Sequence, residues 1–316
     1  MKVLVTGGAG FIGSHVVRKL LRAGHSVTAL DDFNDFYDPA IKRANVQEFE
    51  NQAEIIEGDI CDAEKMRRVA TKDKFDAIIH IAARAGVRPS VENPLRYIET
   101  NVTGTFNMLE AARAGGVGQF LFASSSSVYG LARKVPFSED TPLPQTLSPY
   151  AATKLAGEHL CGNYPHLYGL RVVCLRFFTV YGPAQRPDLA IHKFTDHIFH
   201  GKPIQQYGDG STRRDYTYVD DIVQGVVGAL TYRRTPFEIF NLGENQTTTL
   251  SDLIAAIETA LGKKAEIERL SEQQGDMPLT CADIDKARAL LGYNPQVKIS
   301  EGIPKFVAWY LANKKS

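Results

Sequence analysis

The feature that most constrains the fold is a glycine-rich turn near the N-terminus. The turn reads Thr6-Gly7-Gly8-Ala9-Gly10-Phe11-Ile12-Gly13, between an apolar run (2–7) and an amphipathic stretch (12–23). Glycines three residues apart allow a tight turn and a close approach of the backbone to a pyrophosphate, whose charge then lies at a helix N-terminus. An ordinary glycine turn is the alternative, but the position between a strand and a helix favours a dinucleotide-binding unit.

Four more apolar runs follow along the first half of the chain, at 26–31, 53–59, 76–83 and 119–125. They are rich in Val, Ile and Leu and apolar on both faces, which is the pattern of strands in a parallel sheet covered by helices on both sides. Amphipathic stretches such as 97–114 lie between them. Repeated strand–helix units of this kind predict an α/β fold with a doubly wound (Rossmann) parallel sheet.

The pattern changes after about residue 180, where proline and glycine become frequent. We expect helices over 251–262 and 301–313 and an extended segment over 263–270. The sequence therefore predicts a Rossmann domain formed by 1–179 plus about 215–242. A smaller C-terminal α/β lobe for the substrate would comprise about 180–214 plus 243–316.

The charge balance limits the class of partner. The 316 residues include 36 basic and 36 acidic side chains, which argues against a nucleic acid or a membrane surface as partner. The four cysteines are scattered without metal-binding spacing, and we predict no metal site. No apolar run approaches the roughly 20 residues of a membrane helix. We expect a cytoplasmic protein with reduced thiols and no signal peptide.

Two adjacent acids indicate which dinucleotide is bound. Asp31 and Asp32 end the second predicted strand, where a carboxylate can accept hydrogen bonds from the ribose hydroxyls of an adenosine. A 2′-phosphate would be repelled there, and the next basic residue is Lys42, so the expected cofactor is NAD rather than NADP. Asp59 ends the third strand and would reach the adenine edge, with a solvated loop position as the alternative. The residues expected to hold NAD are Gly7, Gly10, Phe11, Ile12, Gly13, Asp31, Asp32, Asp59, Ile60, Ala82, Tyr150 and Lys154.

A second motif indicates proton transfer. Tyr150 and Lys154 are four residues apart and would share one face of a helix. A lysine ammonium near a phenol favours the phenolate and lowers the pKa of the tyrosine, which can then act as a general base on a hydroxyl. The pattern is common alone, but here it follows a nucleotide-binding turn and the segment Ala123-Ser124-Ser125-Ser126-Ser127-Val128-Tyr129-Gly130.

These motifs together resemble the extended short-chain dehydrogenase/reductase superfamily, whose members mostly act on nucleotide-sugars. The resemblance covers the whole chain. It implies that Ser125 hydrogen-bonds the 4-hydroxyl of a sugar, that Tyr150 is the base, and that Lys154 supports it and holds the nicotinamide ribose. It also implies a nucleotide-sugar-binding second lobe and a homodimer paired through helices 97–114 and 150–163. Ser124 is either a further contact or a strand-end cap.

The identity of two serines bears on the reaction. Members that dehydrate the sugar resemble this chain but carry an Asp-Glu pair at Ser126 and Ser127, and members that decarboxylate UDP-glucuronate commonly carry Glu at Ser127. Two neutral hydroxyls do not readily remove a C5 proton. The remaining reaction is removal and return of hydride at C4, a 4-epimerisation through a 4-keto sugar.

The expected sugar is UDP-glucuronate, converted to UDP-galacturonate. The segments 176–188 and 32–39 resemble those of UDP-glucuronate 4-epimerases. Arg186 offers a planar fork for a carboxylate, and Thr179 and Ser127 add neutral donors. Arg186 serving the diphosphate or a surface ion pair is an alternative. The other readings are a UDP-glucose or UDP-N-acetylhexosamine 4-epimerase, a UDP-glucuronate decarboxylase and a non-catalytic NAD-binding sensor.

Three further substrate contacts rest on the resemblance. Arg213 is the candidate phosphate ligand, with a solvated loop position as the alternative. Arg88 either faces the substrate or is structural. Asp276 belongs to a Gly-Asp-x-Pro turn of the superfamily, but Gln274 stands just before it where many relatives carry Arg, which removes one expected diphosphate contact.

Overall fold

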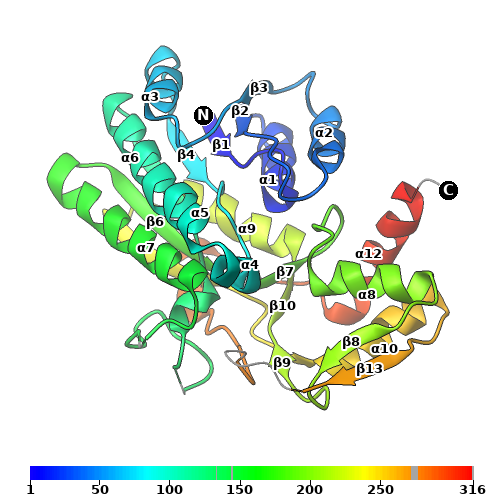
Figure 1. Cartoon of the computed structure of the whole chain (residues 1–316). Helices are drawn as coiled ribbons and strands as arrows, with labels where there is room; N and C mark the ends of the chain where they lie inside the picture. Colours follow the sequence, from blue (N-terminus) through cyan, green and yellow to red (C-terminus); the bar gives the residue numbers. More distant parts are fainter. Residues whose placement is uncertain (133, 144, 272–276, 315–316) are drawn as a thin grey trace.

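The computed structural model describes residues 1–132, 134–143, 145–271 and 277–314, and a parallel sheet lies at its centre (Figure 1). Within these residues the sheet has seven strands in the order β11-β6-β5-β4-β1-β2-β3, all parallel to their neighbours. The prediction of a doubly wound parallel sheet is confirmed. The strands are β1 (Lys2–Thr6), β2 (Ser26–Asp31), β3 (Glu54–Glu57), β4 (Ala77–His80), β5 (Gln119–Ser125), β6 (Arg171–Phe177) and β11 (Phe237–Leu242).

Helices cover both faces of this sheet, and each strand contributes side chains to both. On one face lie α1 (Phe11–Arg22) and α9 (Val219–Leu230), and on the other α3 (Ala63–Lys72), α6 (Thr105–Ala114) and α7 (Pro149–Tyr168). In β1, Val3 and Val5 belong to one hydrophobic cluster and Leu4 to the other. Full burial of each such side chain is worth about 1.5–3 kcal/mol. The sheet is therefore the shared wall of two cores.

The order of the strands reverses between β1 and β4, which are neighbours at the middle of the sheet. The chain winds outward through β2 and β3, then returns and winds the other way through β4, β5 and β6. In such sheets the carboxyl ends of the strands at the reversal open onto a crevice, and ligands bind there. The glycine turn follows β1 at this edge.

A smaller group of elements packs against the carboxyl edge of the sheet, at the lower right of Figure 1. It contains three short strand pairs: β7 (Thr179–Tyr181) with β10 (Tyr216–Tyr218), β8 (Ile204–Tyr207) with β13 (Ile267–Leu270), and β9 (Arg213–Arg214) with β12 (Thr248–Thr249). The associated helices are α8 (Ala190–Phe199), α10 (Leu250–Leu261) and α12 (Ile299–Asn313). The chain returns to the main sheet at β11, beside which α11 (Asp285–Leu291) packs. The division into two domains stays a prediction.

The predicted helix 97–114 is not continuous. It comprises the last residue of α5 (Pro94–Tyr97), a π-helical turn η1 (Ile98–Gly104) and α6. Asn101 accepts a hydrogen bond from the Arg84 amide (2.8 Å) and donates to the Arg84 carbonyl (2.9 Å) and to Thr153 on α7 (3.0 Å). Turns of this type are frequent at functional sites. This one ties the loop after β4 to α7.

The remaining short elements complete the chain trace. They are α2 (Pro39–Gln47), α4 (Val87–Glu92) and the 3₁₀ turn η2 (Ser126–Tyr129). In the described part of the chain, no helix is both long enough and apolar enough to span a membrane.

Candidate active site

One cavity of about 1470 Å³ runs from the glycine turn across the carboxyl edge of the sheet to the second lobe. Its walls include most of the residues that the sequence indicated. From the first half of the chain these are Gly7, Gly10, Phe11, Ile12, Gly13, Asp31, Asp32, Asp59, Ile60, Ala82 and Arg88. From the rest of the chain they are Ser125, Ser126, Ser127, Tyr150, Lys154, Thr179 and Arg186.

The glycine turn packs closely against the start of α1 and the loop after β4. A Cβ atom on Gly13 would lie 2.0 Å from the Gly7 carbonyl oxygen, and Gly7 has a positive φ of 69° with its Cβ position 2.8 Å from the Ala82 amide nitrogen. Only glycine fits at these two positions. Helix α1 begins after Gly10 without a capping side chain or an acidic residue in its first turn. Its N-terminal amides therefore suit an anionic group in the cavity.

The two acids at the end of β2 pair with a lysine to which the sequence analysis assigned no role. Lys42 on α2 is buried, and its Nζ lies 2.9 Å from Asp31 Oδ1 and 3.4 Å from Asp32 Oδ1. Asp31 also accepts a hydrogen bond from the Ala9 amide (3.2 Å), which fixes the glycine turn to β2. Burial raises the pKa of Asp31, and the Lys42 charge opposes this shift. Two carboxylates against one ammonium leave this end of the cavity acidic.

The first turn of α7 presents Tyr150 to the cavity. Ser148 caps the helix by accepting a hydrogen bond from the Ala151 amide (3.1 Å), and Pro149 occupies the first helical position. Both are typical of a helix N-terminus. This start fixes the helical register, so Tyr150 and Lys154 lie one turn apart on the cavity wall.

The serines at the end of β5 and the start of η2 bring several hydroxyls to the cavity that this tyrosine lines. The amide and the hydroxyl of Ser127 both donate to Ser125 Oγ, at 3.2 and 3.0 Å. Hydrogen bonding by the Ser125 side chain also lowers the pKa of the Tyr150 phenol. Ser124 is buried and donates to the buried Glu158. All four serines line the cavity, and the hydroxyl of Ser124 is engaged by this interior carboxylate.

The pKa shifts of Tyr150 and Lys154 differ from the prediction that the lysine lowers the pKa of the tyrosine. Burial raises the pKa of Tyr150, and the influences that oppose this shift are the Ser125 hydrogen bond and the charge of Arg186. The ammonium of Lys154 instead donates to the Ala123 carbonyl (2.7 Å) below the cavity. Burial lowers the pKa of Lys154 to about 8, so it is still mainly protonated at neutral pH. The lysine stem reaches back to β5, which is why its charge is directed away from the phenol.

Arg186 lies in the same wall and already has a partner. Its Nε and Nη2 donate to the two oxygens of Asp188, at 2.9 and 2.6 Å. The guanidinium lies over the ring of Phe36, 5.3 Å from its centre. Phe36 and Asp188 both line the cavity, and sequence reasoning assigned no role to either side chain.

The structure corrects the choice of arginine in β9. Arg213 hydrogen-bonds the side chain and carbonyl of Thr247 and is not among the described residues that line the cavity, whereas Arg214 is. Successive strand residues point to opposite faces, so a change of one position reverses the assignment. The Cζ atom of Arg88 on α4 lies 4.7 Å from the ring centre of Tyr207 on β8. Both residues line the cavity, so this contact joins the two lobes across it. Asp276 and Gln274 lie outside the described residues.

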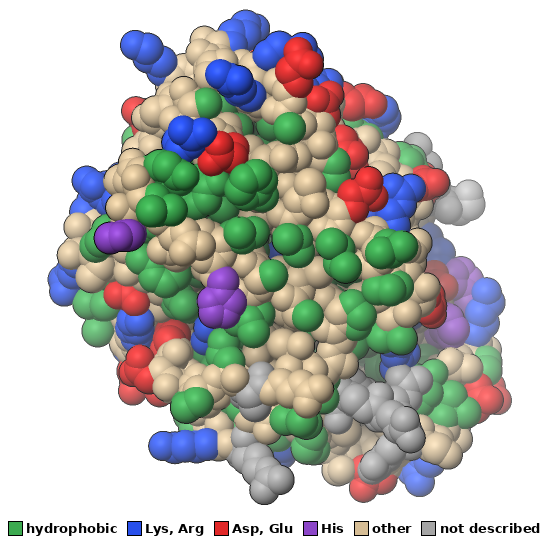
Figure 2. All heavy atoms as spheres, turned by 60° about the vertical axis from the view of Figure 1, so that its left-hand side comes forward, with side chains coloured by type: hydrophobic (Ala, Val, Ile, Leu, Met, Phe, Trp, Pro, Cys, Tyr) green, Lys and Arg blue, Asp and Glu red, His purple; other side chains and the backbone are tan. Residues whose placement is uncertain are grey.

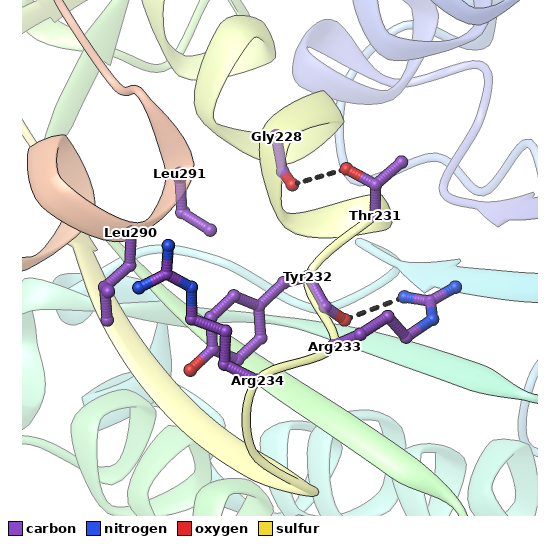
Figure 3. Close-up of a pocket in the computed structure, with 7 residues that line it drawn as sticks. All are labelled: Gly228, Thr231, Tyr232, Arg233, Arg234, Leu290 and Leu291. Atoms are coloured by element: carbon purple, nitrogen blue, oxygen red, sulfur yellow. Dashed lines mark hydrogen bonds between the residues drawn. The ribbon is translucent and has the colours of Figure 1, made fainter.

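A second hollow of about 430 Å³ lies beside α9 and α11, away from the sheet edge (Figure 3). Its arginine Arg233 donates to the carbonyls of Leu230 and Tyr232 and to Gln119, and Thr231 bonds back to Gly228. These bonds complete the end of α9, so we assign the hollow no function. Among the described residues, no cluster of three His, Cys, Asp or Glu side chains suits a metal ion.

Comparison with known proteins identifies the family. The family model described as GDP-mannose 4,6 dehydratase matches residues 4–306. UDP-glucuronate 4-epimerase 4 of Arabidopsis thaliana is 44% identical, over 98% of this chain and 75% of its own. UDP-glucuronate 4-epimerase of Thermodesulfobacterium geofontis is 42% identical, over 98% of this chain and 96% of its own.

A solved structure is similar over the same length. UDP-glucuronic acid 4-epimerase from Bacillus cereus, in complex with UDP-glucuronic acid and NAD, aligns with a TM-score of 0.93 and 37% identity over 99% of both chains. Sequence and fold agree from end to end. The chain therefore belongs to the GDP-mannose 4,6-dehydratase family, within the extended short-chain dehydrogenases/reductases that act on nucleotide-sugars.

Proposed function

We propose that this protein is an NAD-dependent UDP-glucuronate 4-epimerase, which interconverts UDP-glucuronate and UDP-galacturonate. The observation that carries the proposal is the set of hydroxyls of Ser127, Ser125 and Tyr150, in one cavity wall with Arg186. The relatives named above are epimerases of this kind, and one was solved with both UDP-glucuronic acid and NAD.

The residues of the glycine turn fit NAD. The close turn that Gly7 and Gly13 permit and the uncapped start of α1 suit its pyrophosphate. Asp31, Asp32, Asp59 and Ile60 would hold the adenosine half, and Lys154 the nicotinamide ribose. NAD supplies the acceptor that takes the C4 hydride and gives it back.

The protein's own groups would handle the proton and the substrate oxygens. Tyr150 takes the proton of the 4-hydroxyl and later returns it to the 4-keto oxygen, while Ser125 hydrogen-bonds the same oxygen. The hydrogen bond from Ser125 and the charge of Arg186 both favour the phenolate against the effect of burial. These roles, like those of the other site residues, are proposals.

Arg186, Thr179, Ser126 and Ser127 would hold the uronate carboxylate. A 4-keto uronate is a β-keto acid, which loses CO₂ when the breaking C–C bond aligns with the carbonyl π system. Donors that fix the carboxylate away from this alignment would keep the product a hexuronate. Replacing Arg186 should therefore raise the share of pentose product.

A UDP-glucose 4-epimerase is the second candidate, and one observation favours it. Because Arg186 is already paired with Asp188, a neutral sugar could occupy the cavity without leaving a buried charge unpaired. The two candidates share the C4 chemistry and differ in the sugar that the pocket accepts.

The test is incubation of the purified protein with UDP-glucuronate, without added NAD, and analysis of the products by NMR. UDP-galacturonate without CO₂ release supports the proposal and shows that NAD copurifies. UDP-xylose or a 4-keto pentose would contradict the assigned restraint of the carboxylate. Turnover of UDP-glucose alone would establish the second candidate. Tyr150→Phe, checked for retained NAD, is the catalytic control.

We also propose a homodimer in a cytoplasmic setting. Large apolar side chains are exposed over α4 to α7, among them Leu95 (75% exposed), Ile98, Phe106 and Leu167. Figure 2 shows hydrophobic side chains gathered on this face. Such patches mark protein interfaces. The four free cysteines suit a reducing compartment. Light scattering should give twice the chain mass, and Leu95→Glu with Phe106→Glu should halve it; a monomeric parent would refute the dimer.

A further inference from the structure

We infer that Asp188 is a positioning residue: it is the resident counter-ion of Arg186, and it sets the preference between acidic and neutral sugars. The inference rests on the proposed role of Arg186 in the sugar pocket.

Asp188 occupies only one edge of the guanidinium. The carboxylate accepts hydrogen bonds from Nε–H and one Nη2–H. These two donors form the side-on fork of the guanidinium. Arginine has five N–H donors in a fixed plane, so the end-on fork of Nη1 and Nη2 is left. Within the described residues Nη1 makes no hydrogen bond. The Cζ atom of Arg186 also lies 5.3 Å from the centre of the Phe36 ring. Arg186 is thus held by Asp188 along one edge and contacts an aromatic ring.

The pair lies against the reaction site. The side chain of Arg186 is 15% exposed and that of Asp188 31%, and both line the cavity with Thr179 and Ser127. Tyr150 lines the same cavity, and the charge of Arg186 lowers the pKa of its phenol. A uronate carboxylate beside Tyr150 would therefore bind the end-on fork of Arg186, while Asp188 stays bound to the side-on fork.

The loop that carries the pair is anchored on both sides. Gln185 donates through its amide to the Gly182 carbonyl (3.1 Å) and through its side chain to the Val180 carbonyl (3.2 Å). The ring of His192 contacts the Gln185 carbonyl (2.8 Å). Since Asp188 follows Arg186 by two residues on this loop, the ion pair does not depend on how the two lobes are placed.

Two carboxylates on one guanidinium have a functional consequence. The negative charge of Asp188 weakens the attraction between Arg186 and a uronate, but it leaves no bare charge when the sugar is neutral. During epimerisation the sugar must turn, so its carboxylate must leave Arg186. Asp188 keeps the guanidinium paired at that moment. Asp188 therefore lowers the affinity of the site for the uronate and allows the sugar to turn during the reaction.

The test compares Asp188→Asn with the parent, both loaded with NAD. Calorimetry measures the binding of UDP-glucuronate and UDP-glucose to each. We expect Asp188→Asn to bind UDP-glucuronate about tenfold more tightly relative to UDP-glucose, because one nearby negative charge is removed. Steady-state kinetics with UDP-glucuronate should then show a lower KM and a lower kcat. An affinity ratio that stays the same, or moves toward UDP-glucose, would overturn the inference.

Two variants control for charge and for folding. Asp285→Asn breaks an exposed pair with Arg288 that has the same chemistry outside the cavity, and the affinity ratio should not change. Asp188→Glu keeps the charge and should restore the parental ratio; failure to restore it would show that the effect is merely structural. If the parent does not epimerise UDP-glucuronate, the proposed function fails, but the affinity ratios still decide the role of Asp188.

Discussion

A neighbouring hydroxyl acts on Tyr150, the proposed base. The Ser125 hydrogen bond lowers the pKa of the phenol, which burial raises. Removing that bond in Ser125→Ala should raise the pKa further, so the phenolate forms only at higher pH. We expect the rising limb of kcat/KM against pH to move to higher pH, with activity at pH 7 reduced by about 10²-fold. Ser125→Thr keeps the hydroxyl and should leave the limb in place. If the rising limb of the kcat/KM profile does not move in Ser125→Ala, Ser125 takes no part in proton transfer.

A buried histidine couples stability to pH. His80 on β4 is 1% exposed and lies between the hydroxyls of Thr6 (2.7 Å) and Thr105 (3.1 Å). Burial lowers its pKa from 6.5 to about 3. Between these values the unfolded chain binds a proton that the folded protein does not, so stability falls as pH decreases through this window. The loss is about 1.4 kcal/mol per pH unit.

His80→Gln keeps polar contacts at this position and removes the titration. Urea unfolding between pH 6.5 and 4.5 should give a slope of stability against pH that is smaller by that amount. Equal slopes in parent and variant would mean that His80 is protonated in the folded state.

At the scale of elements, a buried ion pair joins helix, strand and serine segment. Arg176 on β6 donates to both oxygens of Glu158 on α7 (2.9 and 2.8 Å) and to the hydroxyl of Tyr129 (3.0 Å). Tyr129 donates onward to Asn241 on β11 (2.7 Å). Arg176→Met would leave Glu158 charged and unpaired in the core, so we expect a loss of about 3–5 kcal/mol in the free energy of unfolding.

The double variant tests the cause of that loss. Glu158→Leu combined with Arg176→Met replaces both charges by apolar groups and should recover most of the stability in urea titrations. A double variant as unstable as Arg176→Met alone would show that shape, rather than charge, matters at this site.

What the sequence predicts well is set by local spacing. The glycine turn and the Tyr150–Lys154 pair each lie within one short element, so their geometry follows from residue type and helical or strand period. The π-turn was missed because Asn101 finds its partners at Arg84 and Thr153, far away in sequence. The sequence indicates Arg213 as the phosphate ligand, whereas Arg214 lines the cavity, because the register of β9 depends on β12, which follows more than 30 residues later. Nothing in the sequence brings Lys42 to Asp31.

At the scale of the whole molecule, one carboxylate joins segments on which the second half of the cavity depends. Asp215 is fully buried between β9 and β10. It accepts hydrogen bonds from the amides of Glu244 (2.7 Å), Asn245 (3.1 Å) and Ala282 (2.9 Å), and from Thr217 (3.0 Å). Its neighbours Arg214 and Tyr216 line the cavity, as does Thr280. The wall opposite the glycine turn is therefore assembled around this group.

Asp215→Asn should loosen that wall selectively. An amide offers N–H groups where backbone N–H groups require acceptors, so at least one hydrogen bond from a backbone amide to a charged acceptor is lost, at about 1.5–3 kcal/mol. We expect a lower Tm and, at a temperature where the variant is folded, a larger loss of affinity for UDP than for NAD in calorimetry. Asp283→Asn changes a nearby carboxylate whose one hydrogen bond within the described residues is local, from the Asp285 amide (3.0 Å), and this variant should bind both ligands normally. Equal losses for UDP and NAD in Asp215→Asn would mean that this carboxylate stabilises the fold as a whole, without a special relation to the second lobe.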